Sequence, residues 1–314
     1  MELVYAYGQE SDSALQQEFL SGVREIAACA QTINIRVKIE SLVQQSDRIL
    51  DLDYSPEARA KLTAAGRDPA KRTIIREYAL HGESMLQTGT DDRGNDFVVA
   101  CNPVYAFGLQ RPKGMKEYGI RFLEQVGIDP QVEQLIDQTS QEGLSMVFSG
   151  WSILGERLDT LVASKEFQIE KIATVDHGDS KLVRIDFQRR VADIRPGKLS
   201  FGDSYLLSDP KKQWGVVEYA VTILGKDGKP GLRREVHSVL QIVNSVPITT
   251  KMTGTGSLDG DPKIVQEGST TFEILSTDVP QSEFLARVRP ATQKMRAKCA
   301  IVVKKESNQQ LWIA

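Results

Sequence analysis

The chain has 314 residues, of which 40% are hydrophobic and 26% are charged, and its formal net charge is −3 at pH 7. This is the composition of a globular protein with enough apolar residues for a sizeable core, in one elaborated domain or in two. The small negative charge gives no overall electrostatic footprint for nucleic acid or for anionic membranes. No run of about 18 apolar residues occurs, so we expect no transmembrane segment.

The N-terminal part predicts a helix followed by strands. Apolar residues recur at helical spacing over residues 11–30, which predicts an amphipathic helix. Residues 33–41 then alternate between apolar and polar, as a strand with one buried face does. Pro56 opens a short helix that Gly66 ends. Further extended segments are predicted at residues 72–87, 97–101, 104–109 and 118–126.

The pattern changes at Asp129-Pro130, where Asp129 can cap a helix that has Pro130 in its first turn. We predict a helical insertion over residues 129–162 between two strand-forming halves. Helical segments placed between sets of strands usually pack on a face of the sheet.

The C-terminal half predicts a run of antiparallel strands from residue 167 to residue 242. Asp227-Gly228 lies between two of them and favours a hairpin, because Asp-Gly readily adopts the positive φ of such a turn. Gly254-Thr255-Gly256-Ser257 is predicted to belong to a flexible hairpin loop over residues 254–262. Other extended segments are predicted at residues 247–252, 264–275, 283–288 and 296–303.

No motif of catalytic chemistry is present. The three histidines, His81, His177 and His237, have no zinc-ligand spacing, and His177 and His237 are predicted to be a solvated turn residue and an exposed strand residue. The nucleophile elbow, the P-loop and a complete calcium loop are absent. The sequence therefore predicts no catalytic residue, no metal and no cofactor. The cysteines Cys29, Cys101 and Cys299 are predicted to be buried thiols, which leaves the redox compartment open.

Apolar side chains offer a more informative set. Candidate lining residues of a hydrophobic cavity are Tyr105, Phe107, Leu144, Met146, Phe148 and Trp151. The alternative is that they simply form the core. A curved sheet capped by helices reconciles the two, since a cavity there would be an incompletely filled core.

Several segments carry a family resemblance. They are Asn102 to Leu109, Leu158 to Leu161, Phe167 to Glu170, Leu182 to Phe187, Ser204 to Pro210 leading to Trp214, and Asp278 to Phe284. With the order of elements, they resemble the LolA/LolB-like superfamily of periplasmic lipoprotein carriers, and more closely its divergent, planctomycete-type members. The resemblance implies an α+β fold with a large curved antiparallel sheet, an incomplete β-barrel, and helices packed in its concave face.

The resemblance also implies a domain division and a function. Residues 1–12 would be disordered, residues 13–305 a single half-barrel domain with the insertion 129–162 as its lid, and residues 306–314 a tail. The expected function is a non-enzymatic envelope protein that binds a lipid or lipoprotein acyl chain as a carrier, with an envelope protein as a further partner. Alternatives are a sensor or interaction module of the same fold and a secreted hydrolase with unplaced carboxylates. Location is expected in the periplasm or envelope, with the leader removed, or alternatively in the cytoplasm.

Overall fold

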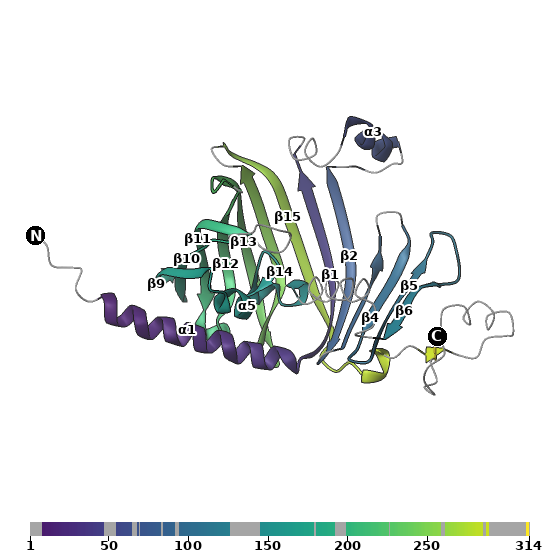
Figure 1. Cartoon of the computed structure of the whole chain (residues 1–314), viewed down its shortest axis with the longest axis horizontal. Helices are drawn as coiled ribbons and strands as arrows, with labels where there is room; N and C mark the ends of the chain where they lie inside the picture. The colour runs from purple at the N-terminus through teal and green to yellow at the C-terminus, as the bar shows by residue number, and fades with distance from the viewer. Residues whose placement is uncertain are drawn as a thin grey trace, which may run out of the picture. The chain divides into compact units, whose positions relative to one another are not determined.

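A computed structural model describes residues 8–46, 55–64, 68, 70–82, 84–91, 94–125, 145–178, 180–191, 199–225, 227–258, 261–284, 287–288 and 312–313. Its main element is an antiparallel sheet of 13 strands in the order β6-β5-β4-β3-β2-β1-β15-β14-β13-β12-β11-β10-β9 (Figure 1). The sheet is not closed, because β6 and β9 each have a neighbour on one side only. The α+β class and the open antiparallel sheet are therefore confirmed.

The chain divides into two compact units. Unit 1 comprises residues 1–30, 39–74 and 145–273, and unit 2 comprises residues 31–38, 75–144 and 274–314. The domain division predicted from the sequence stays a prediction. The helix α1 (Gly8–Gln31) begins within residues 1–12, the segment that the sequence resemblance implies to be disordered.

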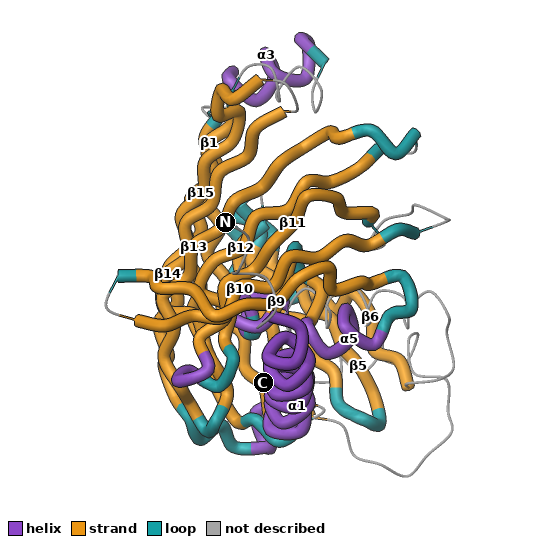
Figure 2. Tube along the Cα trace, turned by 90° about the vertical axis from the view of Figure 1, so that its left-hand side faces the viewer, coloured by secondary structure: helices purple, strands orange, loops and turns teal. Residues whose placement is uncertain are grey.

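Figure 2 draws the strands of unit 1 in orange, and each of them pairs antiparallel with the next along the chain. They are β9 (Phe167–His177), β10 (Ser180–Arg189), β11 (Ser200–Asp209), β12 (Gly215–Leu224), β13 (Pro230–Val243), β14 (Val246–Leu258) and β15 (Asp261–Ser276). The predicted hairpin between β12 and β13 is confirmed, with Gly228 at φ +75°. Next to β15 lies β1 (Asn34–Gln45), and α3 (Pro56–Ala64) follows β1 along the chain.

Residues 254–257 correct the sequence prediction, because they lie inside β14 and not in a loop. Gly254 pairs with Val236 on one side and with Gly268 on the other. A neighbour on each side satisfies the backbone hydrogen bonds of this glycine-rich stretch, so the stretch remains extended.

The helix α1 packs on unit 1 through one stripe of side chains. Phe19, Val23 and Ile26 are buried, as the predicted periodicity requires. The Phe19 ring lies 5.8 Å from the Trp214 ring in an edge-on arrangement. Trp214 follows the 3-10 turn η2 (Pro210–Lys212), which Asp209 caps by accepting a hydrogen bond from the Lys211 N–H at 2.9 Å.

Unit 2 contains a meander of short strands. These are β2 (Lys71–His81), which begins in unit 1, β3 (Ser84–Thr90), β4 (Asp96–Cys101), β5 (Tyr105–Arg111) and β6 (Gly119–Gln125). The single extended segment predicted over residues 72–87 is therefore two strands, since Gly82 turns the chain at φ +57°. The 3-10 turn η3 (Gln281–Phe284) follows β15 along the chain, and the short strand β16 (Arg287–Val288) pairs with β17 (Trp312–Ile313). Phe284 packs with Val279 and Ala79 in this unit.

Candidate functional site

One transverse row of residues crosses the buried face of the unit 1 strands. Direct register pairs join one residue on each strand from β9 to β15. The row is Ile172, Ile185, Leu206, Tyr219, Val236, Gly254 and Gly268. Its first five members are buried apolar or aromatic side chains. The row therefore begins as packed core and ends, on β14 and β15, in two positions without side chains.

The space above these two glycines is not taken by another side chain. A Cβ atom at Gly254 would meet only the Glu235 carbonyl oxygen and Val236 Cγ2, both at 3.4 Å, and one at Gly268 would meet only the Leu42 carbonyl oxygen, at 3.6 Å. Gly22 on α1 is different, because the Trp214 ring fills the place that a Cβ would take there. We call Gly254, Gly256 and Gly268 the glycine strip. Gly256 is buried, and a Cβ there would meet Gln266 Cβ at 3.5 Å and Leu232 Cδ1 at 3.6 Å. The strip therefore continues the apolar row as open backbone at Gly254 and Gly268, which are half-buried, and ends at the covered Gly256.

A covering segment, residues 145–163, lies on the same unit. It contains η1 (Ser149–Trp151), the two short strands β7 (Ser152–Ile153) and β8 (Glu156–Arg157), and α5 (Leu158–Ala163). The turn η1 packs on β12, β13 and β14. The tip of the β7–β8 hairpin reaches the transverse row, because the Leu154 N–H donates a hydrogen bond to the Tyr219 hydroxyl at 3.4 Å.

Three predicted lining residues belong to this covering segment. Phe148 and Trp151 are fully buried, with ring centroids 6.3 Å apart and planes nearly perpendicular. Met146 is half-buried. Leu144 lies outside the described residues. Here Phe148 and Trp151 hold η1 on the sheet, so their role as lining residues stays a prediction.

Tyr105 and Phe107, the remaining predicted lining residues, belong to unit 2. Their ring centroids lie 6.4 Å apart on β5. Phe107 belongs to a buried hydrophobic cluster with Ala100 and Leu109, against which partly buried hydrophobic side chains pack. The structure thus groups Tyr105 with Phe107 and Phe148 with Trp151. A direct role of Tyr105 and Phe107 in binding also stays a prediction.

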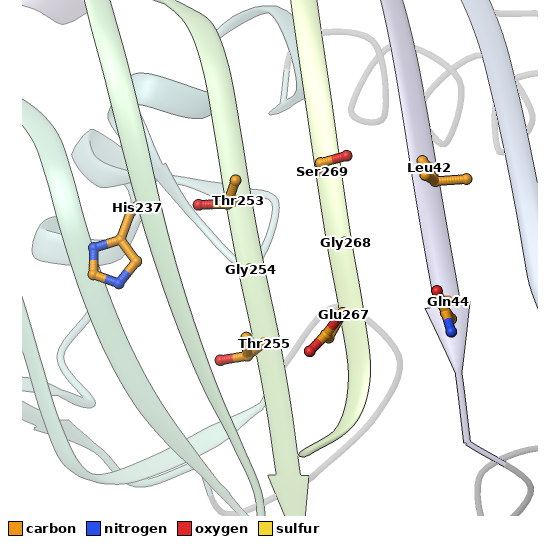
Figure 3. Close-up of a pocket in the computed structure, with 9 residues that line it drawn as sticks. All are labelled: Leu42, Gln44, His237, Thr253, Gly254, Thr255, Glu267, Gly268 and Ser269. Carbon is orange, nitrogen blue, oxygen red and sulfur yellow. The ribbon is translucent and has the colours of Figure 1, made fainter.

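The polar face of the same unit 1 strands carries an open pocket of about 330 Å³ (Figure 3). Figure 3 shows Thr253 and Ser269 at one level of β14 and β15, and Thr255 and Glu267 at another, with Gly254 and Gly268 between the levels. The rest of the lining is His237, Leu42 and Gln44. Hydroxyl, amide, carboxylate and imidazole groups make this a hydrogen-bonding surface, and none of the predicted lining residues contributes to it.

A row of hydrogen-bonded polar side chains lies on this face beside the pocket. His237 Nδ1 lies 3.1 Å from a carboxylate oxygen of Glu218, and the Tyr205 hydroxyl donates to the other at 2.7 Å. The Arg184 guanidinium stacks 4.0 Å from the centre of the Tyr205 ring. The His237 side chain is 61% exposed, which confirms the predicted exposed strand position.

Burial, and then the Glu218 carboxylate, raise the pKa of Tyr205 to about 12. Because an unfolded tyrosine titrates near pH 10, the stability that protonated Tyr205 contributes is complete below pH ~10 and is lost as pH rises through about 12. In Glu218→Gln we expect the pKa of Tyr205 to fall part of the way, since burial remains. The pKa is read from the ¹³Cζ shift of Tyr205, assigned with Tyr205→Phe. An unchanged pKa in Glu218→Gln would show that the carboxylate has no effect.

A buried ion pair fixes the β7–β8 hairpin to the sheet. Arg189 on β10 has a side chain that is 2% exposed and donates from Nη1 to the carboxylate of Glu156, which is 21% exposed. The guanidinium also lies 5.9 Å from the centre of the Phe201 ring. The hairpin position over Tyr219 therefore depends on a charge pair taken largely out of water.

The described residues show no metal site and no membrane helix. Within them, no group of three or more His, Cys, Asp or Glu side chains is placed to hold a metal ion. None of the helices in the described part is long and apolar enough to cross a membrane. The unit 1 strands carry an apolar row that ends in glycines on one face and polar groups on the other.

Sequence reasoning did not find the glycine strip. A signal was present, because Gly254, Gly256 and Gly268 occur in stretches rich in threonine and serine. Glycine inside a strand often marks the close approach of another group. The signal was assigned to a loop, and only the strand register places Gly254 opposite Gly268.

No protein-family model and no curated protein matches the chain. Two solved structures are similar to it. One is a DUF1329 family protein from Desulfovibrio piger, at 8% identity and a TM-score of 0.43, over 86% of this chain and 96% of that one. The other is a putative outer membrane lipoprotein-sorting protein domain from Vibrio parahaemolyticus, at 8% identity and a TM-score of 0.40, over 84% and 95%. Neither assigns a role to any residue of this chain.

Proposed function

We propose that the chain is a non-enzymatic binding protein that holds a lipid acyl chain on the glycine strip of unit 1. The observation that supports this is the transverse row, which is filled by side chains from β9 to β13 and is bare at Gly254 and Gly268. An apolar chain laid there would extend the core. Each methylene removed from water stabilises the complex by about 0.8 kcal/mol, so such a site depends on apolar contact more than on polar groups.

The predicted lining residues enter the proposal in two places. Phe148 and Trp151 hold the covering segment on β12 to β14, while half-buried Met146 would contact the bound chain directly. Tyr105 and Phe107 are proposed as lining residues of a separate apolar contact, within unit 2 alone. We include the partners and location that the sequence resemblance implies: a lipid or acylated lipoprotein, and the cell envelope. Fractionation of the native host tests the location.

Filling the strip tests the proposal. In Gly254→Val/Gly268→Val we expect co-purifying acyl species, measured by native mass spectrometry and lipid extraction of protein from its own host, to fall at least about tenfold. The loss of roughly two methylene contacts accounts for this factor. The variant should fold, because both new Cβ atoms meet neighbours at ordinary contact distances.

The matched control changes the opposite face of the same strands. Thr253 and Ser269 are direct partners on β14 and β15, one position before Gly254 and one after Gly268. Thr253→Val/Ser269→Val should retain its acyl species. Protein that carries no acyl species from its host, and acquires none from envelope lipids, would contradict acyl binding and favour an interaction module.

A further inference from the structure

Arg234 stands beside the glycine strip on the buried face of unit 1. It is the register partner of Val221 on β12 and of Gly256 on β14. Val221 is fully buried and Arg234 is half-buried. A guanidinium is thus placed at the margin of an apolar surface, next to a position without a side chain.

The guanidinium has a neutral partner. Arg234 Nη2 donates to the side-chain oxygen of Gln266 at 3.1 Å. Because Gly256 is the register partner of both residues, this hydrogen bond passes over Gly256, at the end of the strip. Within the described residues no carboxylate pairs with Arg234. Other arginines do have such a partner: Arg36, Arg111, Arg157, Arg184, Arg189 and Arg233.

A half-buried cation bonded to an amide alone favours an anionic ligand. A guanidinium presents several N–H donors in a planar fork that fits a carboxylate, and charge-assisted hydrogen bonds are about twice as strong as neutral ones. The Tyr219 hydroxyl lies on the adjacent row and accepts from Leu154, so its own proton can be donated to a ligand. This hydroxyl is protonated at neutral pH, as an ordinary tyrosine is, and burial raises the pKa of Tyr219 further.

The glycine strip has about the width of a single acyl chain. Gly254 and Gly268 are neighbours on adjacent strands, which lie about 4.8 Å apart. Gly256 lies two residues from Gly254, roughly 7 Å along the strand. Of the acylated partners proposed above, this surface therefore fits a ligand with one acyl chain better than a membrane lipid or a lipoprotein anchor with two or three chains.

We propose that the ligand is a long-chain fatty acid whose carboxylate binds Arg234 and whose chain lies on the glycine strip. This inference rests on the proposed function, because it names the head group and the number of chains for the same site. Gln266 orients the guanidinium, and Tyr219 supplies a second donor.

The test compares cis-parinaric acid with its methyl ester, which has the same chain without the charge. Fluorescence titrations are made on the full chain for the wild type, Arg234→Gln, Arg234→Lys and Arg233→Gln. We expect Arg234→Gln to bind the acid about tenfold more weakly and the ester as the wild type does. Arg234→Lys should bind the acid with intermediate affinity. Arg233→Gln, a control on the polar face beside Glu235, should bind both probes normally.

The outcomes separate the two proposals. If Arg234→Gln binds the acid as tightly as the wild type does, the head-group assignment is wrong and acyl binding stands. If the wild type binds neither probe, acyl binding itself is contradicted. Should Arg234→Gln prove unfolded by circular dichroism, the comparison moves to Arg234→Lys and to the wild type, where equal affinity for acid and ester overturns the assignment.

Discussion

Glu156→Ala is expected to destabilise the fold by about 3 kcal/mol, because it leaves the charge of Arg189 buried without its partner. Arg189 has a side chain that is only 2% exposed, and its Nε already has no hydrogen-bond partner. With Glu156 gone, the guanidinium keeps its contact with the Phe201 ring and loses its anion. The free energy of unfolding, from urea denaturation followed by tryptophan fluorescence, measures the effect.

Two further variants separate the charge from the packing. Arg189→Met/Glu156→Ala removes both charges, so we expect it to be more stable than Glu156→Ala alone. Glu235→Ala removes a partner of Arg233 on the polar face, where the carboxylate side chain is 46% exposed, and should change stability by less than about 1 kcal/mol. If Glu156→Ala and Glu235→Ala lower the free energy of unfolding by the same amount, the buried pair stabilises the fold no more than the exposed pair does.

The parts of the fold that were predictable are those set by local periodicity. Helix α1 was foreseen from one apolar stripe, and most of the strands from alternation. The turn at Asp227-Gly228 was foreseen because a single dipeptide determines the positive φ it needs. Such features depend on residues close together in the sequence, so one sequence suffices to see them.

The candidate site depends on register, which one sequence does not reveal. Gly254 and Gly268 lie opposite each other only because β14 and β15 pair as they do. Arg234 directly follows Arg233 in the sequence, yet neighbouring strand residues face opposite sides, and only Arg233 lies on the polar face with Glu235. The aromatic residues Phe148 and Trp151 were visible in the sequence, but their complete burial follows from how η1 packs.

Gly22→Ala is expected to destabilise the fold by about 2 kcal/mol, although helix propensity alone favours alanine by about 1 kcal/mol. Gly22 faces the sheet from the middle of α1, and the added methyl group would overlap the Trp214 ring. The ring has little freedom to retreat, because it already packs edge-on against Phe19, one turn earlier on the same helix. Gln213 and Trp214 themselves have positive φ angles of 52° and 54°, so the backbone that carries the ring is constrained as well.

The sign of the change identifies its cause. Ser21→Ala places the same methyl-bearing residue at an exposed position of the same helix and should leave stability unchanged or slightly raise it. In a Trp214→Leu background the overlapping ring is gone, so Gly22→Ala should lose most of its cost, and the two substitutions should show a large coupling energy. Thermal and urea unfolding of the four proteins of this cycle measure it. A Gly22→Ala variant more stable than the wild type would mean that α1 does not pack on Trp214, because only that contact opposes the helix propensity of alanine.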